Sequence, residues 1–416
     1  MRVHIRHAKV IDSQSDLNGK PVNIELEIHS KKDTRLKGGF NIAASKENKP
    51  SIIVDGKEVY NGKDIFISPG WIDVFADYRE PGFEQKETIT TGLAAAASGG
   101  FTDVLLAPNT NLPVTNKSAI QYLLQKAKGS IVNLHPHGAI SQNIEGKEIA
   151  EMLDMRANGA IAFTDGWKPL QSADLMLKAL EYVKAFDGTL LQIPVDTALS
   201  AGGLMHEGEL STVLGMTGIP ALAETLILQR DIELLRYTGS KLHVCGVSTA
   251  ASVALIRRAK AEGLRISCSV TPYHLALTDK ALQGYSSLYK VSPPLRGEAD
   301  RQALIAGLDD GTIDCITSHH RPHEWDAKAK EFEYAADGMA VQESTFNILW
   351  DTLKAKIGIE KLINALTINP RKIFGLHPNT INKENMAGIT IFTTNDSYTL
   401  TENNKKSMGC NNPFFK

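Results

Sequence analysis

The chain is 416 residues long, has a formal net charge of −2 at pH 7, and contains 42% apolar and 22% charged residues. This length exceeds a single small core and predicts one large α/β domain with a smaller companion. The charge gives no electrostatic case for binding nucleic acid or an anionic membrane, and no apolar run approaches the roughly 20 residues that span a bilayer. Four cysteines without C-x-x-C spacing indicate neither a disulfide framework nor a zinc knuckle. Because the start also lacks a signal-peptide pattern, we expect a cytoplasmic protein.

Both ends of the chain show short alternating runs that predict β-strands. Residues 1–65 contain the predicted strands Arg2–Ile11, Ile24–Ile28 and Ser51–Val54, separated by clusters rich in Gly, Asn and Lys. Residues 371–416 contain two more, Gly388–Thr393 and Ser397–Leu400. We expect these segments to form one small composite β-sandwich domain, which would bring the termini together.

Residues 66–370 alternate short apolar runs with amphipathic stretches such as Ala173–Lys184, Ile219–Arg236 and Ala250–Ala261. Parallel strands need a helical crossover, so eight such units in sequence predict an α/β fold with a closed (β/α)8 barrel of the TIM type. The predicted barrel strands are Trp71–Phe75, Phe101–Leu106, Ser130–Leu134, Ala160–Phe163, Leu190–Ile193, Lys241–Cys245, Arg265–Ser269 and Ile313–Thr317.

The chemistry of such a barrel lies at the carboxyl ends of its strands. A hydrolytic zinc site needs about three protein ligands and one open position. The H-x-H pair His135/His137 is interrupted by a proline, and we expect it to lie in a solvent-facing loop. Asp165 and Asp196 are expected to cap helices or anchor loops. The adjacent His319 and His320 should point to opposite faces of their strand and therefore not share one ion.

The segment PGWIDVFADYREPG, residues 69–82, resembles the D-x-H-x-H-x-R-E-P-G signature of class I dihydroorotases. Further motifs of that family follow in order along the chain. The resemblance implies a barrel of the amidohydrolase superfamily and a role in pyrimidine biosynthesis. The other matching segments include Lys86-Glu87, Gly99-Gly100-Phe101-Thr102, Pro108-Asn109-Thr110, Met205-His206-Glu207-Gly208, Pro293-Pro294-Leu295-Arg296 and Asn412-Pro413-Phe414.

The same resemblance implies a catalytic zinc, yet its ligand positions hold other residues. The family's catalytic aspartate falls on His319. Side chains of Phe, Gly and Pro cannot ligate a metal, and each lost ligand weakens binding about 10–100-fold, so we expect no metal cofactor. The chain therefore resembles the non-catalytic branch of the family. The family's metal-ligand positions are occupied by Phe75, Asp77, Gly166, Pro194 and Gly246.

By resemblance, Arg79, Asn109 and His323 match residues that hold the substrate carboxylate, for which they offer suitable donors. Arg79 could equally form an ion pair at the barrel rim. Ser292 replaces an asparagine that contacts the substrate ring, and Arg321 replaces a small residue and should crowd the pocket.

Three functions follow as hypotheses. The first is a non-catalytic dihydroorotase-like partner or scaffold for aspartate transcarbamoylase, itself expected to be a homo-oligomer. The second is an active dihydroorotase or related cyclic amidase, acting on N-carbamoyl-L-aspartate or dihydroorotate, with a rebuilt site and His319 as base. The third is a protein that only binds a small carboxylate. An unusual metal site would have to come from Asp77, Asp165, Asp196, His319 or His320.

Overall fold

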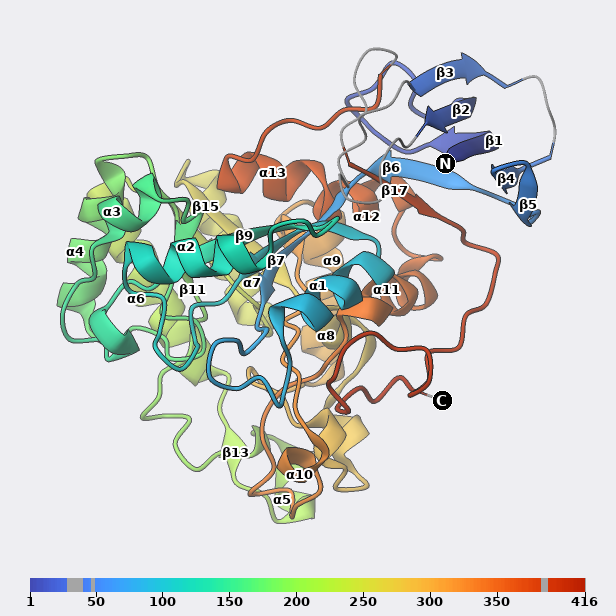
Figure 1. Cartoon of the computed structure of the whole chain (residues 1–416). Helices are drawn as coiled ribbons and strands as arrows, with labels where there is room; N and C mark the ends of the chain where they lie inside the picture. Colours follow the sequence, from blue (N-terminus) through green and yellow to red (C-terminus); the bar gives the residue numbers. More distant parts are fainter. Residues whose placement is uncertain (28–39, 46–48, 383–387, 416) are drawn as a thin grey trace.

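The computed structural model of the chain describes residues 1–27, 40–45, 49–382 and 388–415 (Figure 1). Within these ranges no helix is both long and apolar enough to cross a membrane. The chain builds a parallel barrel and, beside it, a sheet made from both ends of the chain. The predicted α/β fold, a TIM-type barrel with a composite β domain, is confirmed.

The β domain forms because alternating side chains of its strands turn one apolar face inward. β1 runs antiparallel to β2 with Ile5 opposite Ile24, and both side chains are fully buried. The last strand, β17, pairs with β6, which joins the C-terminal part of the chain to the sheet. The strands are β1 Arg2–Val10, β2 Pro21–Glu27, β3 Phe40–Ala44, β4 Ser51–Val54, β5 Lys57–Tyr60, β6 Phe66–Pro69 and β17 Ile389–Phe392.

The barrel strands pair in chain order, all parallel, and the first strand meets the last where Ala76 pairs with His320. Buried Asp73 stabilises this seam by accepting hydrogen bonds from the Ser318 backbone N–H at 2.9 Å and the Gln342 side chain at 2.7 Å. The strands are β7 Trp71–Ala76, β8 Phe101–Leu106, β9 Asn133–Gly138, β10 Ala162–Phe163, β11 Leu190–Gln192, β14 Leu242–Val244, β15 Ile266–Val270 and β16 Cys315–Ile316.

Several barrel helices begin where a side-chain oxygen caps free backbone N–H groups. Thr88 caps α1, Asn116 caps α2 and Thr249 caps α7. The helices are α1 Ile89–Ser98, α2 Lys117–Lys126, α3 Met152–Ala157, α4 Ala173–Lys184, α5 Glu209–Leu214, α6 Leu222–Thr238, α7 Ala250–Ala261, α8 Pro272–Ala276, α9 Glu298–Asp309, α10 Trp325–Lys328, α11 Thr345–Leu353, α12 Ile359–Leu366 and α13 Ile368–Phe374. A small parallel pair, β12 Met205–His206 and β13 Gly218–Ile219, lies in the loop between β11 and α6.

Three sequence predictions about element positions need correction. The third barrel strand begins at Asn133, not at Ser130, and includes both histidines that were expected in a loop. Phe66–Pro69 belongs to the sheet rather than the barrel, because it pairs with β1 and β17. The predicted strand Ser397–Leu400 is irregular, and Ile28, the last residue of another predicted strand, lies outside the described residues.

The C-terminal segment also departs from its predicted place in the β domain. After β17 it returns to the barrel, where Ser407 donates a hydrogen bond to buried Glu87. The Asn411 amide donates to the carbonyls of Arg321 and Gly338, and its oxygen accepts from the His323 N–H. The end of the chain is therefore fastened beside the loop that follows the eighth barrel strand, away from the N-terminus (Figure 1).

Candidate functional site

The mouth of the barrel is filled by aromatic rings. Phe75, at the end of β7, is fully buried, and its ring centroid lies 5.0 Å from that of Trp167 and 5.2 Å from that of His319. The rings of Trp167 and His319 are themselves 5.3 Å apart. These three residues, from strand-end loops far apart in the sequence, pack as a small core at the place where the sequence predicted a lost metal site.

Asp77, the second strand-one ligand position, is engaged by protein groups. Its Oδ2 accepts a hydrogen bond from Trp167 Nε1 at 2.8 Å and lies 3.1 Å from Nη1 of Arg79. Its Oδ1 accepts from the Arg79 backbone N–H at 3.1 Å. Of the two roles that the sequence left open for Arg79, the structure shows the ion pair. The Nε of Arg79 has no hydrogen-bond partner among the described residues.

Gly166 and Gly246, which the resemblance matches to metal ligands of the family, leave no room for a side chain. A Cβ on Gly246 would lie 2.3 Å from Cε1 of His319, and a Cβ on Gly166 would lie 1.9 Å from Oδ1 of Asn109. Their φ angles, +74° and +57°, also fall in the left-handed region that favours glycine. The space that ligand side chains would need has been taken by neighbouring residues. Pro194, at the strand-five position, is buried and carries no ligating atom.

His319, which the resemblance matches to the family's catalytic aspartate, is a neutral, buried ring. Its Nε2 lies 3.1 Å from Sγ of Cys245, within hydrogen-bond distance, while Nδ1 has no partner among the residues described. Burial lowers the pKa of His319 to about 3 and raises the pKa of the Cys245 thiol. A ring with so low a pKa, fully enclosed, is poorly suited to accept a proton from an attacking water.

His320 turns away from His319, as predicted from strand geometry. Its ring packs on Tyr78 with centroids 6.1 Å apart, and Nε2 lies 3.5 Å from buried Glu87. The Glu87 carboxylate also accepts hydrogen bonds from the Thr91 hydroxyl and the Met408 backbone N–H. Glu87 thereby ties the eighth strand, α1 and the C-terminal segment together.

The remaining carboxylates hold loops, which confirms their predicted role. Asp165 accepts hydrogen bonds from the backbone N–H groups of Ile140 and Ser141, both at 2.9 Å. Asp196 accepts from those of Ala198 and Leu199, also at 2.9 Å.

The predicted solvent-facing loop for His135 and His137 is wrong. Both belong to β9. His137 is fully buried, with Nε2 donating to the Val74 carbonyl at 3.1 Å, and burial lowers its pKa to about 4. His135 pairs with Asp103 at 2.9 Å, and Asp103 in turn pairs with Arg371. The interior of the barrel is wide enough to admit polar rings, which the alternation pattern of the sequence did not indicate.

The residues at the mouth do not fit the zinc site that the family implies. Within the part of the chain that the structure describes, no three His, Cys, Asp or Glu side chains come together as a metal-ligand set. The candidates Asp77, Asp165, Asp196, His319 and His320 each contact other groups of the protein instead, and Trp167 contacts both Asp77 and His319. Any unusual metal site would have to break these bonds first.

The substrate-binding positions are likewise occupied by internal bonds. The Asn109 amide donates to the Asp165 carbonyl at 2.9 Å and its oxygen accepts from the Trp167 N–H at 3.1 Å. His323 donates from Nε2 to the Asp337 carbonyl at 2.9 Å, and its Nδ1 accepts from Lys86 Nζ at 3.3 Å. Burial and nearby cations lower the pKa of His323 to about 2, so the ring is neutral.

Ser292 and Arg321 show how the rest of the pocket has changed. Ser292 lines a cavity of ≈170 Å³ together with Val195 and Arg296, but Arg79, Asn109 and His323 do not line it. The guanidinium carbon of Arg321 lies 4.5 Å above the Trp167 ring. Of the predicted substrate residues, Ser292 alone lines this cavity.

Trp167, Cys245 and Glu87 make contacts in and around the mouth that were not singled out from the sequence. Trp167 directly follows the strand-four end Thr164-Asp165-Gly166, so a large aromatic beside a ligand position was the available signal. Glu87 lies within the Lys86-Glu87 motif, but its burial depends on a segment 320 residues later in the chain.

Comparison with known proteins places this geometry in a family. Residues 64–252 match the family model described as dihydro-orotase-like. A dihydroorotase of Syntrophus aciditrophicus (strain SB) is 38% identical over 418 residues, covering 100% of this chain and 95% of the relative. A dihydroorotase of Pelotomaculum thermopropionicum is 41% identical over 397 residues, covering 91% of this chain and 93% of the relative.

Solved structures support the same fold. The L-hydantoinase (dihydropyrimidinase) from Arthrobacter aurescens superimposes with a TM-score of 0.81 at 20% identity, covering 99% of this chain and 91% of that one. At this identity the likeness concerns the fold alone. The family model and the full-length relatives decide the assignment: the chain belongs to the dihydroorotase-like family.

Proposed function

We propose that this chain is a non-catalytic member of its family, which serves in pyrimidine biosynthesis as a partner or scaffold for aspartate transcarbamoylase. The observation that carries the proposal is the packed mouth, in which Phe75, Trp167 and His319 fill the space above the barrel. A hydrolytic metal site needs about three ligands and an open coordination position. Here the ligand positions lack ligating atoms or are already bonded, and side chains occupy the open space.

Loss of the site leaves the barrel intact as a scaffold. Its stability comes from the interior layers and the outer helices, which form the main apolar core of the molecule. Function resides in particular sites on a fold, so a barrel can lose its reaction and keep its surface. The role beside aspartate transcarbamoylase comes from resemblance to the non-catalytic branch of the family.

The first test measures metal and turnover. After dialysis, elemental analysis should find no stoichiometric zinc, and assays with dihydroorotate and N-carbamoyl-L-aspartate should stay at background. The alternative, an active cyclic amidase with a rebuilt site, would be supported by tightly held zinc and by turnover that disappears in an Arg79→Ala variant. That pair of results would overturn the non-catalytic proposal.

The second test concerns ligand binding. Titration calorimetry with dihydroorotate and with N-carbamoyl-L-aspartate should show no binding heat, because Asp77, Asp165 and Asp337 already engage the predicted carboxylate donors. Saturable binding that is lost in Arg79→Ala would instead favour a protein that only holds a small carboxylate.

The third test concerns the partner. The chain and the aspartate transcarbamoylase of the same organism, expressed together, should co-purify, and the complex should differ from the free transcarbamoylase in assembly or activity. Separate elution of the two proteins at micromolar concentration would contradict the scaffold role while leaving the absence of catalysis untouched.

A further inference from the structure

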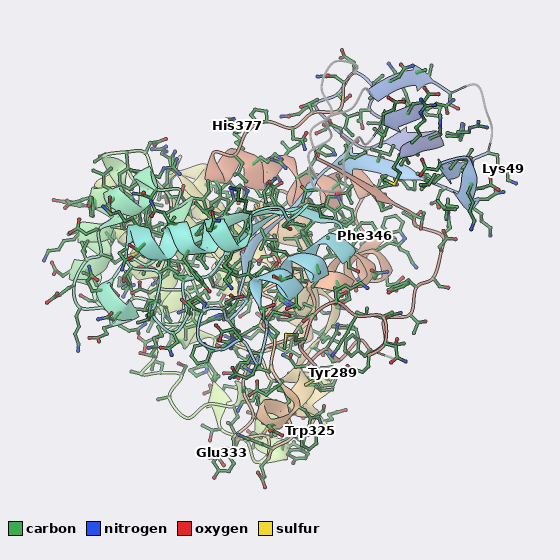
Figure 2. The ribbon with its side chains drawn as sticks, in the orientation of Figure 1. Lys49, Tyr289, Trp325, Glu333, Phe346 and His377 are labelled. Atoms are coloured by element: carbon green, nitrogen blue, oxygen red, sulfur yellow. The ribbon has the colours of Figure 1, made fainter. Side chains whose placement is uncertain are left out.

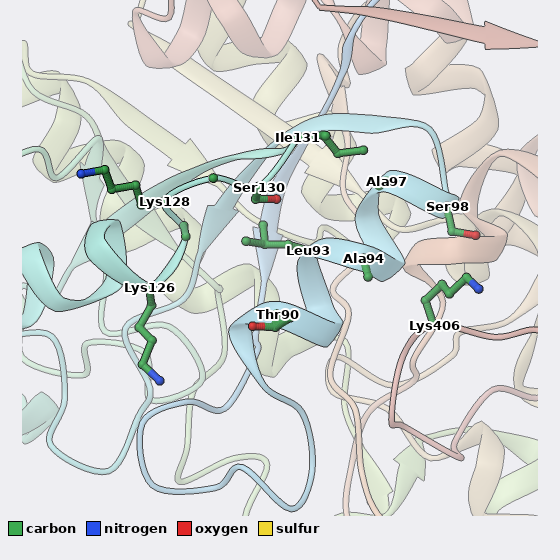
Figure 3. A pocket seen from close by; sticks show the side chains of 12 residues that line it. Thr90, Leu93, Ala94, Ala97, Ser98, Lys126, Lys128, Ser130, Ile131 and Lys406 are labelled. Atoms are coloured by element: carbon green, nitrogen blue, oxygen red, sulfur yellow. The ribbon is translucent and has the colours of Figure 1, made fainter. Parts of the chain in front are cut away.

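An open groove of ≈660 Å³ lies on the outer surface of the barrel, between α1 and the turn that follows α2 (Figure 3). Its apolar floor includes Leu93, Ala94 and Ala97 of α1, and the small side chains of the two alanines leave a depression in the helix surface. Ile131, which is 65% exposed, extends the apolar surface. We call this feature the lysine groove, after Lys126, Lys128 and Lys406 on its rim.

The rim of the lysine groove carries one sign of charge. None of the residues that line it is acidic. Lys126 is already paired with Glu80 at 2.8 Å, but in the described residues neither Lys128 nor Lys406 makes an ion pair through its side chain. An apolar floor bordered by unpaired ammonium groups is complementary to an aromatic segment that carries carboxylates.

The same chain exposes such a segment elsewhere. Residues 325–334, here called the α10 knob, begin with Trp325, which is 70% exposed, and end with Tyr334, which is 68% exposed. Asp326, Glu331 and Glu333 are exposed on it, against a single exposed lysine. Figure 2 shows Trp325 and Glu333 at the end of the molecule opposite the β domain.

Two buried lysines hold the backbone of the α10 knob. Lys328 Nζ donates to the carbonyls of Ser287 at 2.8 Å and Ala336 at 2.7 Å. Lys290 Nζ donates to those of Phe332 at 2.9 Å and Glu333 at 2.8 Å. The Phe332 side chain is buried below the knob. The exposed aromatics therefore stand on a preorganised platform, which lowers the entropy lost on binding.

We propose that two copies of this chain associate by inserting the α10 knob of one copy into the lysine groove of the other. Trp325 and Tyr334 would bury their rings against the apolar floor, since buried Trp and Tyr anchors dominate the energetics of many interfaces. Glu331 and Glu333 would meet Lys128 and Lys406. Each copy has one knob and one groove, so repeated contacts build a closed dimer, a ring or a filament. The inference does not depend on the proposed function.

The test is the oligomeric state of the full chain, measured by sedimentation velocity over a concentration series. Wild-type protein should form dimers or larger assemblies, weakened by salt. Lys128→Glu with Lys406→Glu, or Glu331→Lys with Glu333→Lys, should each weaken self-association by at least about tenfold. The four substitutions together should restore it, because opposite charges again face each other. Trp325→Ala should weaken association without changing its salt dependence.

A matched control replaces Lys57 and Lys117 by glutamate. Both are exposed and lie outside the groove and the knob, so this variant changes the net charge equally and should associate as wild type. Circular dichroism establishes that each variant is folded. A monomeric wild type at tens of micromolar would overturn the proposal. Self-association that neither charge reversal weakens would also overturn it, and so would a fourfold variant that fails to regain self-association. Binding of the groove only to a different protein would overturn it as well.

Discussion

The substitution Gly246→Ala tests most directly whether the mouth is packed as a core. The new Cβ would lie 2.3 Å from Cε1 and 2.9 Å from Nε2 of His319. That ring cannot move freely, because it packs on Phe75 and Trp167 and shares a hydrogen bond with Cys245. Overpacking of a closed core costs about 1–3 kcal/mol.

A second cost comes from the backbone, because alanine at φ +74° is strained by about 1–2 kcal/mol. Gly263 isolates this contribution. It has φ +80°, and a Cβ placed on it would have no neighbouring heavy atom within 4 Å, so Gly263→Ala should cost only the backbone strain. We therefore expect Gly246→Ala to lower the free energy of unfolding by about 2–5 kcal/mol, which exceeds the control by about 1–3 kcal/mol.

Urea unfolding followed by fluorescence and circular dichroism measures both variants. A double-mutant cycle adds His319→Ala, which removes the obstructing ring, so the Gly246→Ala change should then cost about as little as the control. Equal destabilisation by Gly246→Ala and Gly263→Ala would show that the ring yields without cost. The mouth would then contain free space around the His319 ring, and it would not be a closely packed core.

Two further predictions concern titration and local stability. Burial lowers the pKa values of His137 and His274 to about 4 and of His243 and His319 to about 3, so below about pH 6.5 these rings bind more protons in the unfolded chain than in the folded one. Urea titrations at pH 7 and pH 5 should show that the free energy of unfolding falls on acidification, by up to about 1.4 kcal/mol per pH unit for each ring. Buried carboxyls with a raised pKa, such as that of Asp231, oppose this fall. A free energy of unfolding that does not change with pH would contradict the buried neutral rings. Lys328→Ala removes one donor from each of three carbonyls, those of Ser287, Lys290 and Ala336; the first two keep a backbone N–H donor. Hydrogen exchange should therefore accelerate in residues 285–290 and 325–337 but not in the barrel strands, whereas exposed Lys330→Ala should change neither. Uniform acceleration would mean that Lys328 supports the whole fold.

Much of the fold could be predicted from periodicity and local signals. α4 and α7 have the predicted bounds because an apolar stripe coincides with a capping Ser172 or Thr249. β9 was misplaced because its inward-facing residues include His135 and His137, and polar residues inside a barrel resemble a loop in sequence. The path of the C-terminal segment depends on Glu87, a contact across 320 residues that no local pattern encodes.

The resemblance led us to expect Phe75 and Gly246 at positions where the family has ligating side chains, but it did not indicate which side chains would pack around them. The filling required four segments to meet, at residues 75, 167, 245 and 319. The distances between these segments are set when the barrel closes. Barrel closure depends on all eight strands together, so no local sequence pattern indicates these distances.

Placing the family's ligand types at these positions tests whether the packed mouth by itself prevents zinc binding and turnover. The variant would combine Phe75→His, Asp77→His, Gly166→Asp, Pro194→His, Gly246→His and His319→Asp. His319→Asp frees the space beside residue 246, yet Asn109 still lies 1.9 Å from the Cβ that residue 166 would gain.

Trp167 would also lose its acceptor on Asp77 while Arg321 still covers its ring. Catalytic shells must be held to within about half an ångström, so we expect zinc binding to be absent or substoichiometric and dihydroorotase turnover to remain at background. Adding Asn109→Ala, Trp167→Ala and Arg321→Ala should improve zinc retention after dialysis, because it clears the space that the new ligands need. Stoichiometric zinc and turnover in the sixfold variant alone would show that the frame stayed preorganised, and that the packed mouth is not what separates this chain from catalysis.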